Sequence, residues 1–101
     1  MICETPEEFV AQIPAIGAIA GLDLGTVTIG VAISDVLHSV ATPIETIKRK
    51  KFGIDAAKLL ALTTHRLVTG IVLGLPRNMD GSEGPRCQAT RAFARNLERL
   101  T

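Results

Sequence analysis

The sequence predicts a single α/β domain built around one sheet. Its 101 residues are 47% hydrophobic, which is enough to form a core in one domain of this size. Two β-rich runs follow each other closely over residues 16–34, and two segments with helical spacing flank a compact apolar run at residues 70–75. Close strands pair as hairpins, whereas a helix between two strands permits a parallel crossover. We therefore expect the first and fourth strands to be neighbours.

The first residues predict a short helix. Thr5 is a suitable N-cap and Pro6 fits the first helical position. Pro14 should end the helix, because proline removes a backbone donor. We expect residues 1–15 to form an N-terminal helical extension and residues 16–101 to form the main domain.

Three strands are expected next. Residues 16–24 are dense in small and apolar residues, which favours a strand buried on both faces. The β-branched run at residues 28–34 should pair with it as a hairpin. Residues 40–47 alternate between apolar and polar side chains, and Pro43 places this strand at an edge of the sheet, because proline lacks a donor for the ladder.

Two helices should surround the fourth strand, which spans residues 70–75. The helix before it spans about residues 54–67. Its expected apolar stripe consists of Ala57, Leu60, Ala61 and Leu67. The helix after it spans about residues 85–100. Its expected apolar side consists of Ala89, Phe93, Leu97 and Leu100.

Composition excludes several classes of protein. A net charge of +1 argues against binding a polyanion by bulk charge, and the absence of Trp and Tyr argues against a base-stacking platform. Cys3 and Cys87 lack zinc-ligand spacing and fit a reducing compartment. The N-terminus lacks the basic region of a signal peptide, and no apolar run approaches the length of a membrane span. We therefore expect a cytoplasmic protein with no membrane contact.

Asp23 is the first candidate for chemistry. A carboxylate in an apolar strand is costly to bury unpaired, so it should lie near the end of the strand. On the residues alone two interpretations remain open: Asp23 is compensated by a cation, or it caps the turn at Gly25 and Thr26 through hydrogen bonds to the backbone. If the fourth strand is parallel to the first, the loop at residues 77–84 emerges beside Asp23, at the carboxyl ends where open α/β sheets bind ligands.

This loop carries a guanidinium, an amide, two carboxylates and a hydroxyl. The side chains concerned are Arg77, Asn78, Asp80, Glu83 and Ser82. Ser82 is also expected to cap the last helix. Taken alone, Asp80 and Glu83 are more typical of a solvated loop.

Other charged residues carry weaker signals. Asp35 is expected at the opposite end of the hairpin from Asp23, as a turn residue, and His38 and His65 are expected on the surface or at an interface. The basic run at residues 48–51 is able to contact phosphates, as is an arginine row on the last helix. That row consists of Arg91, Arg95 and Arg99. With a net charge of +1, we expect both groups to be solvated faces.

Three segments together resemble the YqgF/RuvX family of Holliday-junction resolvase-like proteins, which are described as pre-16S rRNA nucleases. They are GLDLGTVTIGVAISD at residues 21–35, ATPIETI at residues 41–47 and GLPRNMDGSEGPR at residues 74–86. The resemblance covers roughly residues 18–100 and implies a bacterial, cytoplasmic protein. A shorter likeness of residues 23–26 to the phosphate-binding turn of sugar kinases and actin-like ATPases needs two domains, which 101 residues do not supply.

The resemblance implies a ribonuclease H-like mixed sheet with strand order 3-2-1-4. It also implies a metal-dependent nuclease that cleaves pre-16S rRNA, in which Asp23 is the catalytic residue and binds Mg²⁺ or Mn²⁺. Expected substrate-binding residues are Gly25, Thr26, Arg77, Asn78, Asp80 and Ser82. Two other functions stay open: a resolvase of branched DNA, and a non-catalytic module that binds nucleic acid or a ribosome precursor.

The sequence departs from the family pattern in three places. One of them, Cys87 where the family usually has a small residue, is expected to be neutral. Val27 and Thr28 stand where the family usually has basic residues in the turn. The chain also stops at Thr101, before the family's fifth strand with its acidic motif and before its last helix. The resemblance therefore implies that Asp23 lacks its partner acids, and two interpretations stay open: the chain is a fragment of a longer protein, or it is a truncated product that is inactive alone. It also implies an open sheet edge able to pair with a second copy.

Overall fold

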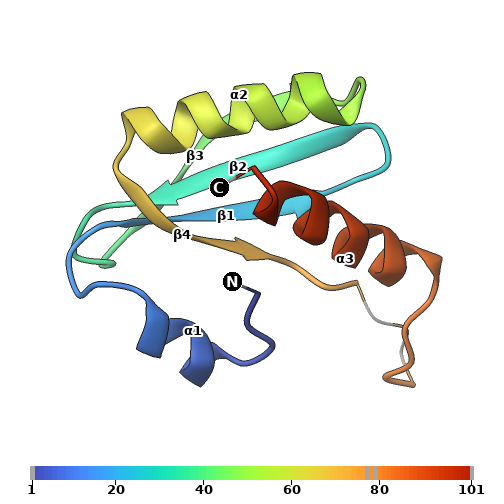
Figure 1. Cartoon of the computed structure of the whole chain (residues 1–101), viewed down its shortest axis with the longest axis horizontal. Helices are drawn as coiled ribbons and strands as arrows, with labels where there is room; N and C mark the ends of the chain where they lie inside the picture. The colour runs from blue at the N-terminus through green and yellow to red at the C-terminus, as the bar shows by residue number, and fades with distance from the viewer. Residues whose placement is uncertain (1, 77, 79, 101) are drawn as a thin grey trace.

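The computed structural model describes residues 2–76, 78 and 80–100, and Figure 1 shows their arrangement. In chain order the elements are α1 (Pro6–Gln12), β1 (Ala18–Leu24), β2 (Thr28–Ser34), β3 (Ala41–Lys48), α2 (Phe52–His65), β4 (Val68–Leu73) and α3 (Pro85–Glu98). The predicted order of elements is confirmed. None of the helices in the described part of the chain is long and apolar enough to cross a bilayer.

The four strands form one mixed sheet in the order β3-β2-β1-β4, as predicted. The neighbours β1 and β2 are antiparallel, as are β2 and β3, whereas β1 and β4 are parallel. The carboxyl ends of β1 and β4 therefore lie at the same edge. The chain leaving β4 stays close to β1 there, because the Gly74 N–H donates to the Leu22 carbonyl at 3.3 Å.

Helices α2 and α3 cover one face of the sheet, where the core lies (Figure 1). Alternate residues of the two central strands point into it, among them Ala20 and Ile29, which are fully buried. Leu59 of α2 and Phe93 of α3 pack against them. The Phe52 and Phe93 rings meet edge to face with centroids 5.3 Å apart, so the two helices also contact each other.

Helix α1 packs on the opposite face, over β4. A Cβ at Gly70 would lie 2.5 Å from Phe9 Cζ and 3.0 Å from Ile13 Cγ2, so glycine allows this close approach. Thr5 accepts a hydrogen bond from the Glu8 N–H at 3.2 Å, which confirms the predicted cap. Toward the carboxyl end of β1 the same face is an open groove.

The burial of the strands differs from prediction in two respects. β1 is not buried on both faces: its buried residues alternate, and Asp23 is exposed, because the two larger helices cover only one side. In β3 the predicted alternation fails at a bulge opposite Val31 and Ala32. As a result Ile44 and Ile47, three residues apart, both pack on the core. Pro43 does lie in an edge strand, as predicted.

The predicted helix faces are also corrected. The buried residues of α2 are Asp55, Ala56, Leu59 and Thr63, so the predicted stripe is displaced by one position. Leu67 lies beyond the helix, in a left-handed conformation, and is 69% exposed. In α3, Phe93 and Leu97 are buried as predicted, but Cys87 and Thr90 complete the buried side instead of Ala89 and Leu100. Burial of Thr90 is possible because its hydroxyl donates to the Arg86 carbonyl at 2.9 Å.

Candidate functional site

Asp23 is the penultimate residue of β1, and its side chain points to the open face of the sheet. It is exposed, whereas its neighbours Leu22 and Leu24 point into the core. Within the described residues the carboxylate has no hydrogen-bond partner, and the following turn is closed by the backbone, with the Gly25 N–H donating to the Thr28 carbonyl at 2.9 Å. The capping interpretation of Asp23 therefore fails, and its carboxylate is free to meet a ligand.

Glycines surround Asp23 on this face. Gly30 lies directly across from it on β2, and a Cβ at Gly30 would lie 3.6 Å from Asp23 Cβ. Gly21, two residues earlier on β1, and Gly74, just past β4, line the same groove, which has a volume of about 610 Å³. Because none of these positions carries a side chain, a bulky ligand can approach the carboxylate closely. This role of the glycines was not predicted from the sequence, although alternation along β1 would have placed Gly21 beside Asp23.

Two arginines lie beside the turn that follows Asp23. Arg49 Nη1 donates to the Gly25 carbonyl at 2.6 Å, and Arg86 Nη2 donates to the Leu24 carbonyl at 3.5 Å. Together with Thr26 these residues line a small pocket of about 50 Å³. The structure thus brings predicted residues Gly25 and Thr26 together with two cations that were not predicted as site residues. The place of Arg49 could have been inferred from the sequence, because it directly follows the strand that pairs with this end of the hairpin.

The loop after β4 is closed on itself. Asp80 Oδ1 accepts hydrogen bonds from the Ser82 hydroxyl at 2.6 Å and from the Ser82 N–H at 2.9 Å, and these bonds lower the pKa of Asp80. Asn78 Nδ2 donates to the same hydroxyl at 3.1 Å. In the described part of the chain no hydrogen bond joins this loop to Asp23. Arg77 was predicted to bind substrate and lies outside the described residues.

Ser82 does not cap α3. The N-cap is Gly84, which has no side chain, and the Ser82 hydroxyl is used within the loop.

Arg91 of α3 connects the loop to the N-terminal residues: it pairs with Glu83 and with Glu4, each at 2.7 Å. These hydrogen bonds raise the pKa of Arg91. The expectation that Arg91 belongs to a solvated row is therefore wrong, whereas Arg95 and Arg99 are exposed as expected.

Asp35, at the other end of the hairpin, is the predicted turn residue. Its Oδ1 accepts hydrogen bonds from the Ser39 N–H at 2.7 Å and the Val40 N–H at 2.9 Å. These hydrogen bonds from the backbone lower the pKa of Asp35, and the bond from Val40 has the largest effect. His38 Nε2 lies 2.6 Å from the Gly17 carbonyl oxygen, so His38 also makes a contact within the fold.

The described residues do not by themselves complete a metal site. They contain no group of three or more His, Cys, Asp or Glu side chains placed to hold one ion. Asp23 supplies one hard carboxylate, which suits Mg²⁺ or Mn²⁺ in kind, but two such ions need several oxygen ligands. The site therefore consists of an exposed carboxylate on a glycine-lined face, with cations beside the next turn.

Comparison with known proteins assigns the chain to a family. The family model described as "RuvX: Holliday junction resolvase" matches residues 17–101. The chain belongs to the RuvX family. This agrees with the observed sheet, because order 3-2-1-4 with α2 and α3 is the ribonuclease H-like arrangement expected from the resemblance.

Curated relatives in the RuvX family are similar along the whole chain. The relative from Ruegeria pomeroyi is 71% identical over 101 residues, that from Paracoccus denitrificans 64% and that from Rhodobacter capsulatus 61%. Each carries the name "Putative pre-16S rRNA nuclease". All 101 residues are aligned in each comparison, and the chain spans 64–66% of the length of these relatives.

Proposed function

We propose that this RuvX chain carries the substrate-facing part of a nuclease site that cleaves phosphodiester bonds in pre-16S rRNA in the cytoplasm, with Asp23 as the catalytic residue. One observation carries the proposal: the exposed Asp23 carboxylate lies on an open face of the sheet, and the neighbouring positions on that face are glycines, which have no side chains. A phosphodiester needs such access, because its backbone must approach the carboxylate without steric hindrance. The names of the relatives supply the substrate.

The residues around Asp23 have separate parts in this proposal. Asp23 holds a negative charge where a hard divalent cation and a scissile phosphate would meet, and Mg²⁺ or Mn²⁺ is the cofactor that such a carboxylate suits. Arg49 and Arg86 keep the carbonyls of Gly25 and Leu24 occupied, so the turn beside Asp23 is held in one conformation. Because the described residues complete no two-ion site, we derive no catalytic step through the metal.

The test compares two substrates, with the chain alone and with the chain extended to the length of its relatives. A 5′-labelled RNA that contains the 16S leader and a labelled four-way DNA junction are each incubated with both proteins and Mg²⁺ or Mn²⁺. Cleavage of the RNA at a defined position by the extended chain, lost in Asp23→Asn, is the expected result. Cleavage of the junction alone would support the second candidate, the resolvase that the family description names. Tight binding of the RNA with no cleavage would contradict catalysis and support a non-catalytic binding module, which the isolated carboxylate favours.

A further inference from the structure

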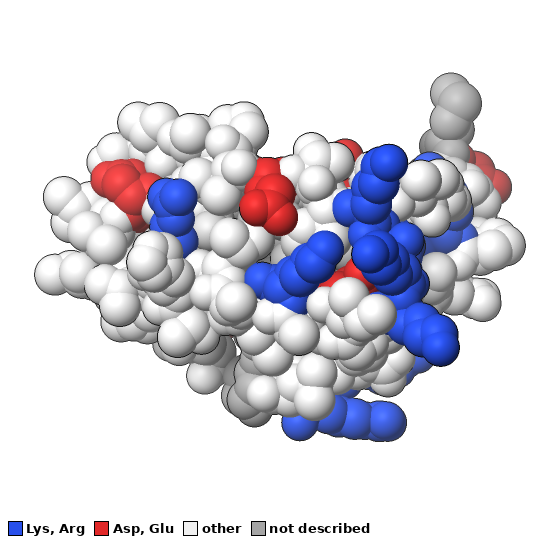
Figure 2. All heavy atoms as spheres, turned by 90° about the horizontal axis from the view of Figure 1, so that it is seen from above, with Lys and Arg blue, Asp and Glu red and all other residues white. Residues whose placement is uncertain are grey.

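A run of consecutive cations lies at the junction between β3 and α2. Residues 48–51 contain four of the protein's 11 Lys and Arg residues. The view in Figure 2 shows Lys and Arg side chains crowded on the half of that face where α2 begins, whereas the other half carries few. Three of the 10 acids lie at residues 4–8, at the start of the chain, where α1 packs over β4 at the opposite edge of the sheet from β3. The net charge of +1 therefore conceals a separation of charge.

One residue of the run faces inward and fixes it to the candidate site. The Arg49 N–H donates to the Val27 carbonyl at 2.8 Å, and its guanidinium donates to the Gly25 carbonyl at 2.6 Å. The same guanidinium lies 5.9 Å from the centre of the Phe93 ring. Both of its backbone partners belong to the turn just after Asp23. The position of the run is thus coupled to the position of the turn.

The buried carboxylate of Asp55 also fixes the backbone of residues 48–51. Asp55, in the first turn of α2, is 1% exposed, and it accepts a hydrogen bond from the Lys50 N–H at 3.1 Å. Burying a carboxylate is unfavourable unless it is bonded, so a buried Asp at this position indicates that its contact is needed. Arg49 and Asp55 together fix the backbone of the run, so its exposed side chains extend from a rigid base.

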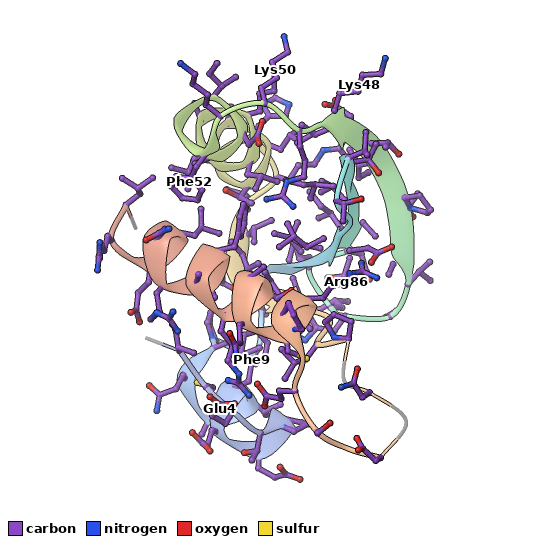
Figure 3. All side chains as sticks on the ribbon, turned by 90° about the vertical axis from the view of Figure 1, so that its right-hand side faces the viewer. Glu4, Phe9, Lys48, Lys50, Phe52 and Arg86 are labelled. Atoms are coloured by element: carbon purple, nitrogen blue, oxygen red, sulfur yellow. The ribbon has the colours of Figure 1, made fainter. Side chains whose placement is uncertain are left out.

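Lys48, Lys50 and Lys51 are the exposed side chains of this base. In the described part of the chain none of their ammonium groups has an ion-pair or hydrogen-bond partner. Figure 3 shows Lys48 and Lys50 extending away from the body of the molecule, with Arg86 lower, at the first turn of α3. Neighbouring lysines that have no partner within the protein are suited to bind successive phosphates of a nucleic-acid backbone.

The pairing of the strands relates these lysines to Asp23. Asp23 is opposite Gly30, Gly30 is opposite Thr46, and Lys48 is opposite Thr28. Cross-strand partners share a face, and so do residues two apart on one strand. Lys48 therefore projects from the same open face as Asp23. With strands about 4.8 Å apart and about 3.4 Å per residue, the two Cα atoms are separated by roughly 12 Å, a distance that a few nucleotides of backbone would bridge.

We propose that Lys48, Lys50 and Lys51 form a phosphate-contact surface for the backbone of the nucleic acid whose scissile bond lies at Asp23. This rests on the proposed function, because it assigns the lysines to the same substrate. It also replaces the expectation that the run is merely a solvated face. Arg49 and Asp55 are positioning residues in this proposal, and the lysines give affinity without reading sequence.

The test measures binding alone. A fluorescently labelled RNA hairpin is titrated with the full chain in EDTA, so that no cleavage occurs, at KCl concentrations from about 50 to about 300 mM. The triple variant Lys48→Gln, Lys50→Gln, Lys51→Gln is compared with a matched triple at exposed sites elsewhere. The matched changes are Arg66→Gln, Arg95→Gln and Arg99→Gln. Removing three positive charges from +1 leaves −2 in both triples, so bulk charge is held equal.

We expect the lysine triple to weaken binding about ten- to hundredfold at low salt and to reduce the slope of log Kd against log salt by about two to three units. The matched triple should change the slope by less than about one unit. Equal losses in the two triples would overturn the proposal, as would a lysine triple that binds like wild type. If the triple does not fold, Lys48→Gln alone should still lower the slope by about one unit, and no change would overturn the surface.

Two further measurements distinguish the lysine surface from the nuclease activity and from a general affinity for anions. Cleavage in Mg²⁺ is measured separately from binding in EDTA; if wild type extended to the length of its relatives fails to cleave while binding still depends on the lysines, the nuclease proposal fails and the surface stands. Vesicles of phosphatidylserine and phosphatidylcholine serve as a second polyanion. Lysine-dependent binding to vesicles without binding to RNA would contradict a nucleic-acid partner.

Discussion

Asp23 and Gly30 face each other across the β1–β2 hairpin, and a Cβ at Gly30 would lie 3.6 Å from the Asp23 Cβ. That separation is ordinary van der Waals contact, so alanine fits at position 30 without strain. A longer side chain would extend over the carboxylate. Glycine at this position thus keeps the open face accessible and is not demanded by the backbone.

The first prediction concerns this position. Gly30→Leu should lower RNA cleavage by about tenfold or more, because its side chain blocks the approach of the phosphodiester to Asp23. Gly30→Ala is the matched control and should change the rate little. Both variants should unfold at urea concentrations close to wild type. Cleavage by Gly30→Leu at the wild-type rate would show that substrate does not approach across this face.

A second prediction tests how α1 packs. Gly70→Ala should destabilise the protein by about 1–3 kcal/mol, because the added methyl collides with Phe9, 2.5 Å from the Cβ position. Gly53 provides the control, since a Cβ there meets nothing within 4 Å and Gly53→Ala in α2 should stabilise slightly. Urea unfolding measures both. Adding Phe9→Leu to Gly70→Ala should recover part of the loss, and a loss unchanged in the double variant would count against the collision.

The third prediction concerns acid. Hydrogen bonds from the backbone at Val40 and Ser39 lower the pKa of Asp35 below its ordinary value of 3.8. A carboxylate with a lowered folded-state pKa contributes stability above its unfolded pKa and loses it as the pH falls through the folded value. Asp35→Ala should therefore cost stability at pH 7, and the difference from wild type should shrink below a pH of about 4. A difference that stays constant down to a pH of about 2 would contradict this account.

A fourth prediction separates stability from positioning at Asp55. Asp55→Ala removes the acceptor of the Lys50 N–H and should lower the free energy of unfolding by about 1–3 kcal/mol. Asp55→Asn keeps an acceptor oxygen and should lose less. If Asp55 also positions the lysines, Asp55→Ala should weaken RNA-hairpin binding at temperatures where it is fully folded. Weakened stability with unchanged binding would leave Asp55 a structural residue only.

The sequence was a good guide to the elements and their order. Pro6, Pro43 and Pro85 restrict the backbone locally, and the β-branched run at residues 28–34 favours a strand on its own, so these features could be predicted without tertiary contacts. The parallel pairing of β1 and β4 followed from the intervening helix.

Burial was harder to predict, because it depends on which partner covers each face. The predicted stripe of α2 was displaced because Asp55 and Thr63 are buried and bonded, and polar residues are normally assigned to the outer face. The bulge in β3 has no strong sequence signal, so the inward position of Ile44 was missed. At the candidate site, the position of Asp23 near the end of its strand was predicted from the cost of burying a carboxylate. The contacts of Arg49 were missed, because its acceptors are carbonyls of a turn distant in sequence.

The most direct test is the single-turnover cleavage rate of 16S leader RNA by Asp23→Asn relative to wild type, both measured in the chain extended to the length of its relatives. Glu7→Gln, which removes one exposed carboxylate from α1 instead, is the matched control. We expect Asp23→Asn to lose at least about 100-fold in rate and Glu7→Gln to cleave like wild type. Equal cleavage rates for wild type and Asp23→Asn would contradict the central claim that the chemistry takes place at Asp23.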